Sequence, residues 1–188
     1  MKTALQNITT IQTGIYVAIE FSGEVVYLQA NNFNEDGQLS TTLVPNLFLT
    51  NQTQRHLLQP GDVLFAAKGT KNFAAVYEEH NGLCVASSTF LVIRINDKSK
   101  SKVLPEFIAW YLNHPNTQKW LKANAIGSAL PSISKSVLSD LEISIPSITK
   151  QKSILKIDSL RLREKQIQNR LIVLKELYIQ QLLQNTLI

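Results

Sequence analysis

The sequence predicts an α+β protein, an irregular β-rich domain with a few helices over residues 1–149 followed by one long coiled-coil helix over residues 150–188. Two observations predict this division. The N-terminal half holds short runs of Val, Ile and Phe that favour strands, and turn residues separate these runs. From about Lys150 onward, apolar residues recur three and four positions apart, which is the spacing of a helix that packs against another helix.

The β-rich part is expected to contain six short strands, at residues 15–19, 25–29, 63–67, 74–77, 83–86 and 90–95. Pro60-Gly61 indicates a type II turn, and Asn81-Gly82 indicates a hairpin between the strands on either side. The segments 31–37 and 39–59 are rich in Asn, Gln and Thr, and we expect long loops or short edge strands there. Long loops on a rigid sheet commonly carry recognition residues.

Residues 98–102 form a basic connector, after which helices are expected to begin at Pro105 and at Pro115, because proline suits the first helical turn. Ser134 is expected to cap a further short helix. Residues 141–146 alternate apolar and polar side chains, which predicts a strand that stops at Pro146.

The long helix carries a largely apolar seam along one face, at eight positions with alternating spacings of three and four. Glu164 and Gln181 are the two polar positions, and the six apolar ones are the expected dimer interface: Ile157, Leu160, Ile167, Leu171, Leu174 and Tyr178. A helix of roughly 35 residues is roughly 50 Å long, about twice the diameter of a small domain. Most of the seam would therefore remain in water, and we expect it to pair with a second helix.

The charge of +5 is unevenly distributed along the chain. Residues 1–97 hold 5 Lys/Arg and 8 Asp/Glu, whereas residues 98–188 hold 14 Lys/Arg and 6 Asp/Glu. A basic half is typical of a nucleic-acid binder, and a Lys/Arg-rich solvated helix face gives the same count, so charge alone leaves both interpretations open.

Several classes of protein are disfavoured. The sequence has no apolar run long enough to span a membrane and no signal peptide, so we expect a cytoplasmic protein with no membrane partner. Cys84 lies in an apolar run and is expected to be a buried structural thiol. His56, His80 and His114 lie far apart, and glycine motifs for nucleotides are missing, so no metal, no cofactor and no catalytic site is expected.

One ordered set of motifs resembles a known family. The set comprises Gly61-Asp62-Val63-Leu64-Phe65, Gly69, the run 86–94, the helix from Pro105, Gly127, the segment 138–146 and Gln151 at the start of the long helix. In this order it resembles one target recognition domain of a type I restriction-modification DNA specificity subunit. The resemblance covers most of the chain.

The resemblance implies a non-catalytic subunit that reads one part of a bipartite site on double-stranded DNA. It also implies docking of DNA adenine methyltransferase subunits, with a restriction and translocation subunit as a further partner of such systems. Full family members have two recognition domains and two long antiparallel helices, whereas this chain has one of each. We therefore expect a half-subunit that forms a homodimer through its helix and reads an interrupted palindrome.

Base reading needs side chains with defined hydrogen-bonding patterns, chiefly Arg, Lys, Asn and Gln, presented on loops. Three loops and one later lysine supply the expected DNA-binding residues: Asn31, Asn32, Arg55, His56, Lys68, Thr70, Lys71, Asn72 and Lys135. Ser87-Ser88-Thr89 matches a family motif but is expected to lie in a strand and to serve packing.

Three alternatives stay open at this point. A truncated, orphan specificity fragment would keep the fold without independent DNA recognition. A structural coiled-coil assembly protein would share the helix but show no preference for a DNA sequence. A nuclease or methyltransferase fragment would need a carboxylate constellation that the sequence does not display.

Overall fold

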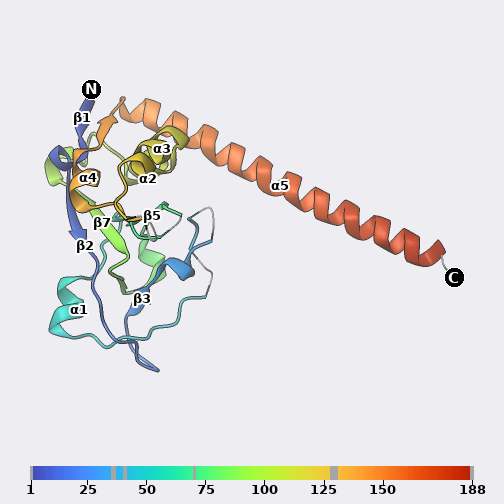
Figure 1. The fold of residues 1–188 in the computed structure, drawn as a ribbon, viewed down its shortest axis with the longest axis horizontal. Helices are drawn as coiled ribbons and strands as arrows, with labels where there is room; N and C mark the ends of the chain where they lie inside the picture. The colour runs from blue at the N-terminus through green and yellow to red at the C-terminus, as the bar shows by residue number, and fades with distance from the viewer. Residues whose placement is uncertain (1, 35–36, 40–41, 70, 128–130, 187–188) are drawn as a thin grey trace. The chain divides into compact units, whose positions relative to one another are not determined.

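The computed structural model describes residues 2–34, 37–39, 42–69, 71–127 and 131–186. The chain divides into two compact units, Met1–Gln151 and Lys152–Ile188. The first unit combines short, irregular sheets with four α-helices, and the second is the greater part of one long helix (Figure 1). The expected α+β class is confirmed. None of the described helices combines the length and apolar content that a membrane crossing needs.

The centre of the first unit is a four-stranded antiparallel sheet in the order β2-β7-β4-β5. Its strands are β2 (Thr9–Thr13), β4 (Val63–Ala66), β5 (Ala74–Val76) and β7 (Phe90–Ile95). All four residues of β4 are buried, as the continuous run of apolar and small residues predicts for a strand covered on both faces.

Two further strand pairs complete the first unit. They are the parallel pair β3 (Val26–Leu28) with β6 (Cys84–Ala86), and the antiparallel pair β1 (Lys2–Ala4) with β8 (Glu142–Ser144). Cys84 is fully buried, and burial raises the pKa of its thiol to about 12. The pair β1–β8 brings the start of the chain to the strand that precedes the long helix.

Five of the six strands expected in the N-terminal half are present, β7 with the expected bounds and the other four with shorter ones. The strand expected at 15–19 is wrong, because only Ile15 forms a bridge, to Ser87, and the chain begins its strand earlier, at β2. Gly14 lies so close to this bridge that a Cβ atom there would be 2.2 Å from the Ser87 carbonyl oxygen. The close approach of two backbones, which periodicity does not encode, decides where this strand ends.

Two expected turns have different outcomes. Pro60-Gly61 forms the expected turn, since the Asp62 amide donates to the Gln59 carbonyl oxygen at 2.9 Å and Gly61 has φ +88°. The hairpin expected at Asn81-Gly82 is wrong, because the strands on its two sides, β5 and β6, pair in different sheets. That segment forms a 3-10 turn, η3 (Glu79–Asn81), which ends at Gly82 with φ +74°.

The run Ser87-Ser88-Thr89 is a turn between β6 and β7 rather than part of a strand, contrary to expectation. The hydroxyl groups of Ser87 and Thr89 lie 2.6 Å apart, which closes the turn locally. Short polar side chains favour turns for this reason.

The helices of the first unit begin where proline or a capping side chain predicts, except for α1, which falls in a segment expected to be loop. They are α1 (Asn51–Arg55), α2 (Pro105–Asn113), α3 (Pro115–Ala123) and α4 (Lys135–Asp140), with the 3-10 turns η1 (Leu5–Asn7), η2 (Ala30–Asn32) and η4 (Asp97–Ser99). Ser134 caps α4 by accepting a hydrogen bond from the Val137 amide, as expected. Helix α2 packs on β4 and β5 and buries Phe107, Ile108 and Leu112.

The long helix α5 (Ile148–Thr186) spans 39 residues and begins two residues before the expected start. Its first turn is fixed by Gln151, whose side chain is completely buried. The Gln151 Oε1 atom accepts from the Leu104 amide at 3.0 Å, and Nε2 donates to the carbonyl oxygens of Lys102 and Pro146 at 2.7 and 2.8 Å. One amide therefore ties the basic connector to the start of the helix.

A buried ion pair closes the sheet beside the Pro60-Gly61 turn. Asp62, with a side chain 1% exposed, accepts two hydrogen bonds from Arg94, at 2.7 and 2.6 Å, and a third from the Gln59 amide at 2.8 Å. The carboxylate raises the pKa of Arg94. Two of the donors lie on β7 and the third at the turn, and Asp62 directly precedes β4, so the pair is an integral part of the central sheet.

We expect Asp62→Ala to lower the free energy of unfolding by about 3 kcal/mol, since it leaves the Arg94 guanidinium partly buried without its counter-charge. Urea unfolding followed by circular dichroism measures the change. Asp97→Ala is the matched control, because Asp97 pairs with Lys100 on the surface, where it is 91% exposed, and its loss should leave the midpoint unchanged. Equal unfolding midpoints for wild type and Asp62→Ala would show that the Asp62–Arg94 ion pair does not stabilise the fold.

Candidate nucleic-acid interface

The loop between β4 and β5 presents two of the expected lysines, Lys68 and Lys71, both exposed. Gly69 has φ +116°, a conformation that favours glycine, and the Asn72 side-chain amide donates to the Ala66 carbonyl oxygen at 2.8 Å. Both features hold the loop in one tight shape. The third expected residue here, Thr70, lies outside the described residues.

A segment far along the chain packs against this loop. The Ile133 amide donates to the Ala67 carbonyl oxygen at 2.8 Å, and Lys68 forms a β-bridge with Ser132. Lys135 follows at once as the first residue of α4, behind its Ser134 cap. The fold thus brings Lys68 and Lys135, which are distant in sequence, to one edge of the domain.

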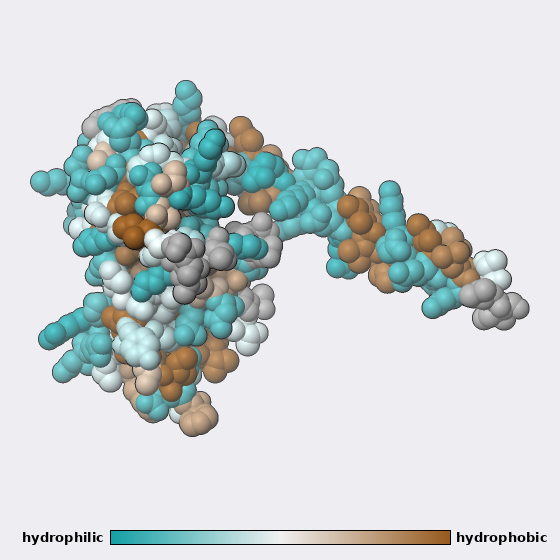
Figure 2. Space-filling model, in the orientation of Figure 1, coloured by the Kyte–Doolittle hydropathy of each residue, from teal (hydrophilic) through white to brown (hydrophobic). Residues whose placement is uncertain are grey.

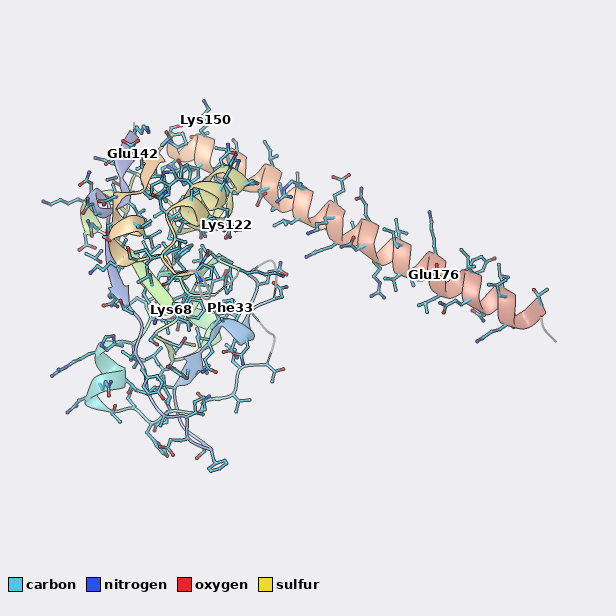
Figure 3. All side chains as sticks on the ribbon, in the orientation of Figure 1. Phe33, Lys68, Lys122, Glu142, Lys150 and Glu176 are labelled. Carbon is cyan, nitrogen blue, oxygen red and sulfur yellow. The ribbon has the colours of Figure 1, made fainter. Side chains whose placement is uncertain are left out.

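The η2 turn, which carries Asn31 and Asn32, meets the same loop through an aromatic contact. The rings of Phe33 and Phe73 lie 5.2 Å apart, and both pack on Phe90. Phe73 directly follows the β4–β5 loop, and Asn113 fixes this end of β5 through two hydrogen bonds of 2.8 Å with Ala74. Figure 3 labels Phe33 and Lys68, which mark the two segments.

We call this surface the basic edge and define it as Lys68, Lys71 and Lys135 with the amide side chains of Asn31 and Asn72. Asn32 is excluded because its Oδ1 atom accepts from the Gln29 amide at 2.8 Å and so caps η2. Asn72 donates from Nδ2 to the loop. The basic edge offers cations for phosphate groups, and amides of the type that read adenine.

Arg55 and His56 lie elsewhere. They lie at the end of α1, which Figure 1 shows well separated from β5, and Leu58, two residues after His56, is hydrogen-bonded to β6 through Cys84. The His56 Nδ1 atom is buried and is the one buried side-chain nitrogen or oxygen, among the described residues, with no hydrogen-bond partner. The structure therefore separates these two expected DNA-binding residues from the basic edge.

Sequence reasoning missed other polar residues near this surface. Lys122 is exposed in the last turn of α3, and the chain that follows α3 pairs with Ser132 through Ile126. The exposed residues Asn34 and Gln38 bond to each other through their side chains at 3.0 Å, beside the Phe33 contact. The basic charge of the C-terminal half could have suggested Lys122; no local signal indicates Gln38.

The second unit presents exposed apolar side chains along α5. All six expected seam residues on α5 are exposed in the single chain, with exposed fractions between 48% and 68%. Leu182, 47% exposed, extends the seam, because it follows Tyr178 by four residues and so lies on the same face. Brown patches along α5 in Figure 2 show how much apolar surface this helix carries.

No group of three or more His, Cys, Asp or Glu side chains that could hold a metal ion occurs in the part of the chain that the structure describes. The arrangement of the basic edge is suited to contact with an extended polyanion along a surface.

Comparison with known proteins gives a consistent result. The model of the type I restriction modification DNA specificity domain matches residues 5–171, which include the first unit from residue 5 onward and the long helix as far as residue 171. No curated protein sequence matches this chain.

Three solved structures share the fold. The type I restriction-modification S subunit from M. genitalium aligns with a TM-score of 0.60 and 14% identity, over 90% of this chain and 40% of that one. The HsdS subunit from Thermoanaerobacter tengcongensis gives 0.57 and 17%, over 87% and 37%. A structure reported for the complex assembly and conformational transition of the type I R-M system aligns with a TM-score of 0.59 and 16% identity, over 87% of this chain and 38% of that one. This chain thus spans about two fifths of each matched chain.

Proposed function

Since this chain belongs to the family of type I restriction-modification DNA specificity domains, we propose that it supplies half of the DNA-recognition subunit of such a system. In this proposal the chain performs no catalysis. It reads one half-site on double-stranded DNA and holds the methyltransferase subunits that modify adenine. The observation that carries the proposal is the family match, which extends over one recognition domain and into one long helix.

The proposed second half is another copy of the same chain. The seam on α5 exposes residues such as Ile157, Leu171 and Tyr178, and a stripe of this size is seldom left in water. Two copies related by a two-fold axis would pack their seams against each other, with the two helices antiparallel. If the axis passes near Ile167, at the middle of α5, Ile157 of one copy lies opposite Tyr178 of the other.

The basic edge is the surface that we assign to DNA. Lys68 and Lys135 come from different parts of the chain but meet at the bridge between Lys68 and Ser132, and both are exposed. Cations of this kind position a protein on the phosphate backbone, whereas amides such as Asn31 supply base contacts.

A two-fold dimer presents two identical recognition domains in opposite orientations, so its target is an interrupted palindrome. The α5 pair separates the two domains and acts as a ruler. At about 1.5 Å per residue, a helix of 39 residues is roughly 58 Å long. The length of helix between the domains then sets the gap between half-sites.

Methylation mapping tests this function. The full chain is co-expressed with the neighbouring methyltransferase subunit in a host lacking other adenine methylation, and modified adenines are mapped genome-wide with and without this chain. We expect methylation only in its presence, at an interrupted palindrome. An asymmetric motif would contradict the homodimer, and no methylation would favour the orphan fragment. Modification by the chain alone, given S-adenosylmethionine, would contradict a non-catalytic role.

A further inference from the structure

One end of the first unit carries an exposed apolar surface that the proposed DNA and dimer contacts do not use. It lies at the end farthest from β1 and β8 in Figure 1, and Figure 2 shows brown and tan side chains gathered there. We call it the apolar tip and define it by six residues with exposed fractions from 44% to 109%: Tyr16, Ile19, Phe21, Val44, Phe48 and Leu49. Soluble proteins seldom expose large contiguous apolar patches without a partner.

Hydrogen bonds hold the two chain segments of the apolar tip together. Its two segments are joined by hydrogen bonds from the Glu20 amide to the Asn46 carbonyl oxygen and from the Glu24 amide to the Leu47 carbonyl oxygen, both 2.9 Å. The Leu49 amide donates to the Glu24 carboxylate at 3.3 Å. Gly23 permits this pairing, because a Cβ atom there would lie 2.2 Å from the Leu47 carbonyl oxygen.

A separate small core lies beneath this pairing. It consists of Ile15, Val25, Tyr27, Leu47 and Val85, and the Tyr27 hydroxyl donates to the Ile15 carbonyl oxygen at 2.8 Å. The tip residues are not members of this core, although Tyr16 and Phe48 directly follow its residues Ile15 and Leu47 in the sequence. Their exposure therefore comes from a packed framework that already has its own interior, rather than from an incomplete core.

Charge decides which kind of partner fits. Residues 3–54 contain no Lys and no Arg, but they contain four acidic residues, of which Glu20 and Glu24 lie within the tip. DNA carries one negative charge per about 1.7 Å of helix axis, so this surface repels it. Aromatic residues that stack on bases lie in positively charged grooves, whereas Tyr16 and Phe21 belong to a stretch of the sequence without Lys or Arg.

A second copy of this chain fits poorly as well. A two-fold interface places the same patch on both subunits, so the acidic residues of one tip would face those of the other. A protein that acts on DNA has the complementary charge, because it needs a basic surface to approach phosphate groups.

We propose that the apolar tip is the docking surface for a methyltransferase subunit, which meets it with an apolar patch bordered by Lys and Arg. This inference rests on the proposed function and identifies the surface at which this chain and the methyltransferase subunit assemble. Phe21 and Tyr16 are the anchors, since large aromatic side chains dominate the affinity of protein interfaces. Glu20 and Glu24 form the acidic rim, which sets orientation and salt dependence.

The test measures the affinity of the full chain for its neighbouring methyltransferase subunit by isothermal titration calorimetry at two salt concentrations. We expect Phe21→Ser to weaken binding at least about tenfold and the double variant Tyr16→Ser, Phe21→Ser about a hundredfold. Glu20→Lys should weaken binding and reduce its dependence on salt. Ser22→Ala is the matched control in the same loop and should bind as wild type does. Thermal unfolding verifies that each variant is folded.

Equal affinity for wild type and the folded double variant would overturn the inference and leave the proposed function intact. No binding by the wild-type chain would overturn both. If the double variant keeps its methyltransferase affinity but loses DNA affinity or changes its oligomeric state, the tip is a surface for DNA or for a second copy, and the inference is wrong.

Discussion

Replacing Leu171 and Leu174 together with Asp is expected to convert the proposed dimer into a monomer. Both leucines lie near the middle of the seam and are 51% and 48% exposed in the single chain, so a partner helix has substantial apolar surface to cover. Burying a fully exposed leucine side chain contributes about 1.5–3 kcal/mol, so each of these half-exposed side chains contributes about half of that, and the proposed symmetric dimer contains each residue twice. The loss amounts to about 3–6 kcal/mol, before any cost of charge, which is about two to four orders of magnitude in Kd.

Size-exclusion chromatography with light scattering measures the mass at several concentrations. The control is Asn169→Asp with Gln180→Asp, which adds the same number of charges on the opposite face of α5, where both amides are exposed. The control variant should remain dimeric. A dimeric seam variant would show that α5 is not the interface.

Replacing Lys68 and Lys135 together with Ala is expected to weaken DNA binding by the assembled complex about tenfold to a hundredfold. Each lysine that neutralises one phosphate group contributes about 0.9 to the slope of log K against log salt, so the slope should fall by about two. Fluorescence anisotropy over a salt series measures both quantities. The oligomeric state should be unchanged, because neither lysine is on α5.

The matched control is the double variant Lys2→Ala, Lys150→Ala. Lys2 pairs with Glu142 on β8, and Figure 3 labels Glu142 and Lys150 at a part of the molecule away from Lys68. This control removes the same charge and should retain the DNA affinity of wild type. If both double variants bind equally well, the basic edge is not the DNA surface. A loss shared by specific and unrelated DNA would assign the two lysines to phosphate groups.

Much of the fold could be predicted because its signals are local. Pro105 and Pro115 begin helices, Ser134 caps one, and the Gly61 turn forms where the dipeptide indicates it. Runs of buried apolar residues mark β4 and β7 for the same reason, since a strand covered on both faces needs them along its whole length.

The failures arise from interactions that the periodicity of the sequence does not encode. The Asn81-Gly82 turn has the residues of a hairpin, but β6 pairs with β3 in parallel and β5 pairs with β4, so long-range pairing overrides the local preference. Helix α1 was missed because its stability depends on the Thr50 and Thr53 side chains, which cap it reciprocally within a polar segment. Neither the pairing of β6 with β3 nor the reciprocal cap of α1 follows from the periodicity of the sequence.

The sequence by itself determined the α+β class, the exposed seam of the long helix and the division of charge between the two halves, because these depend only on residue type and spacing. Only the tertiary structure decided which loops form one surface. It joined Lys68 to Lys135, set Arg55 and His56 apart, and turned Asn32 inward as a cap. These outcomes follow from backbone hydrogen bonds and aromatic packing between segments that are distant in sequence, and no local pattern specifies such pairings.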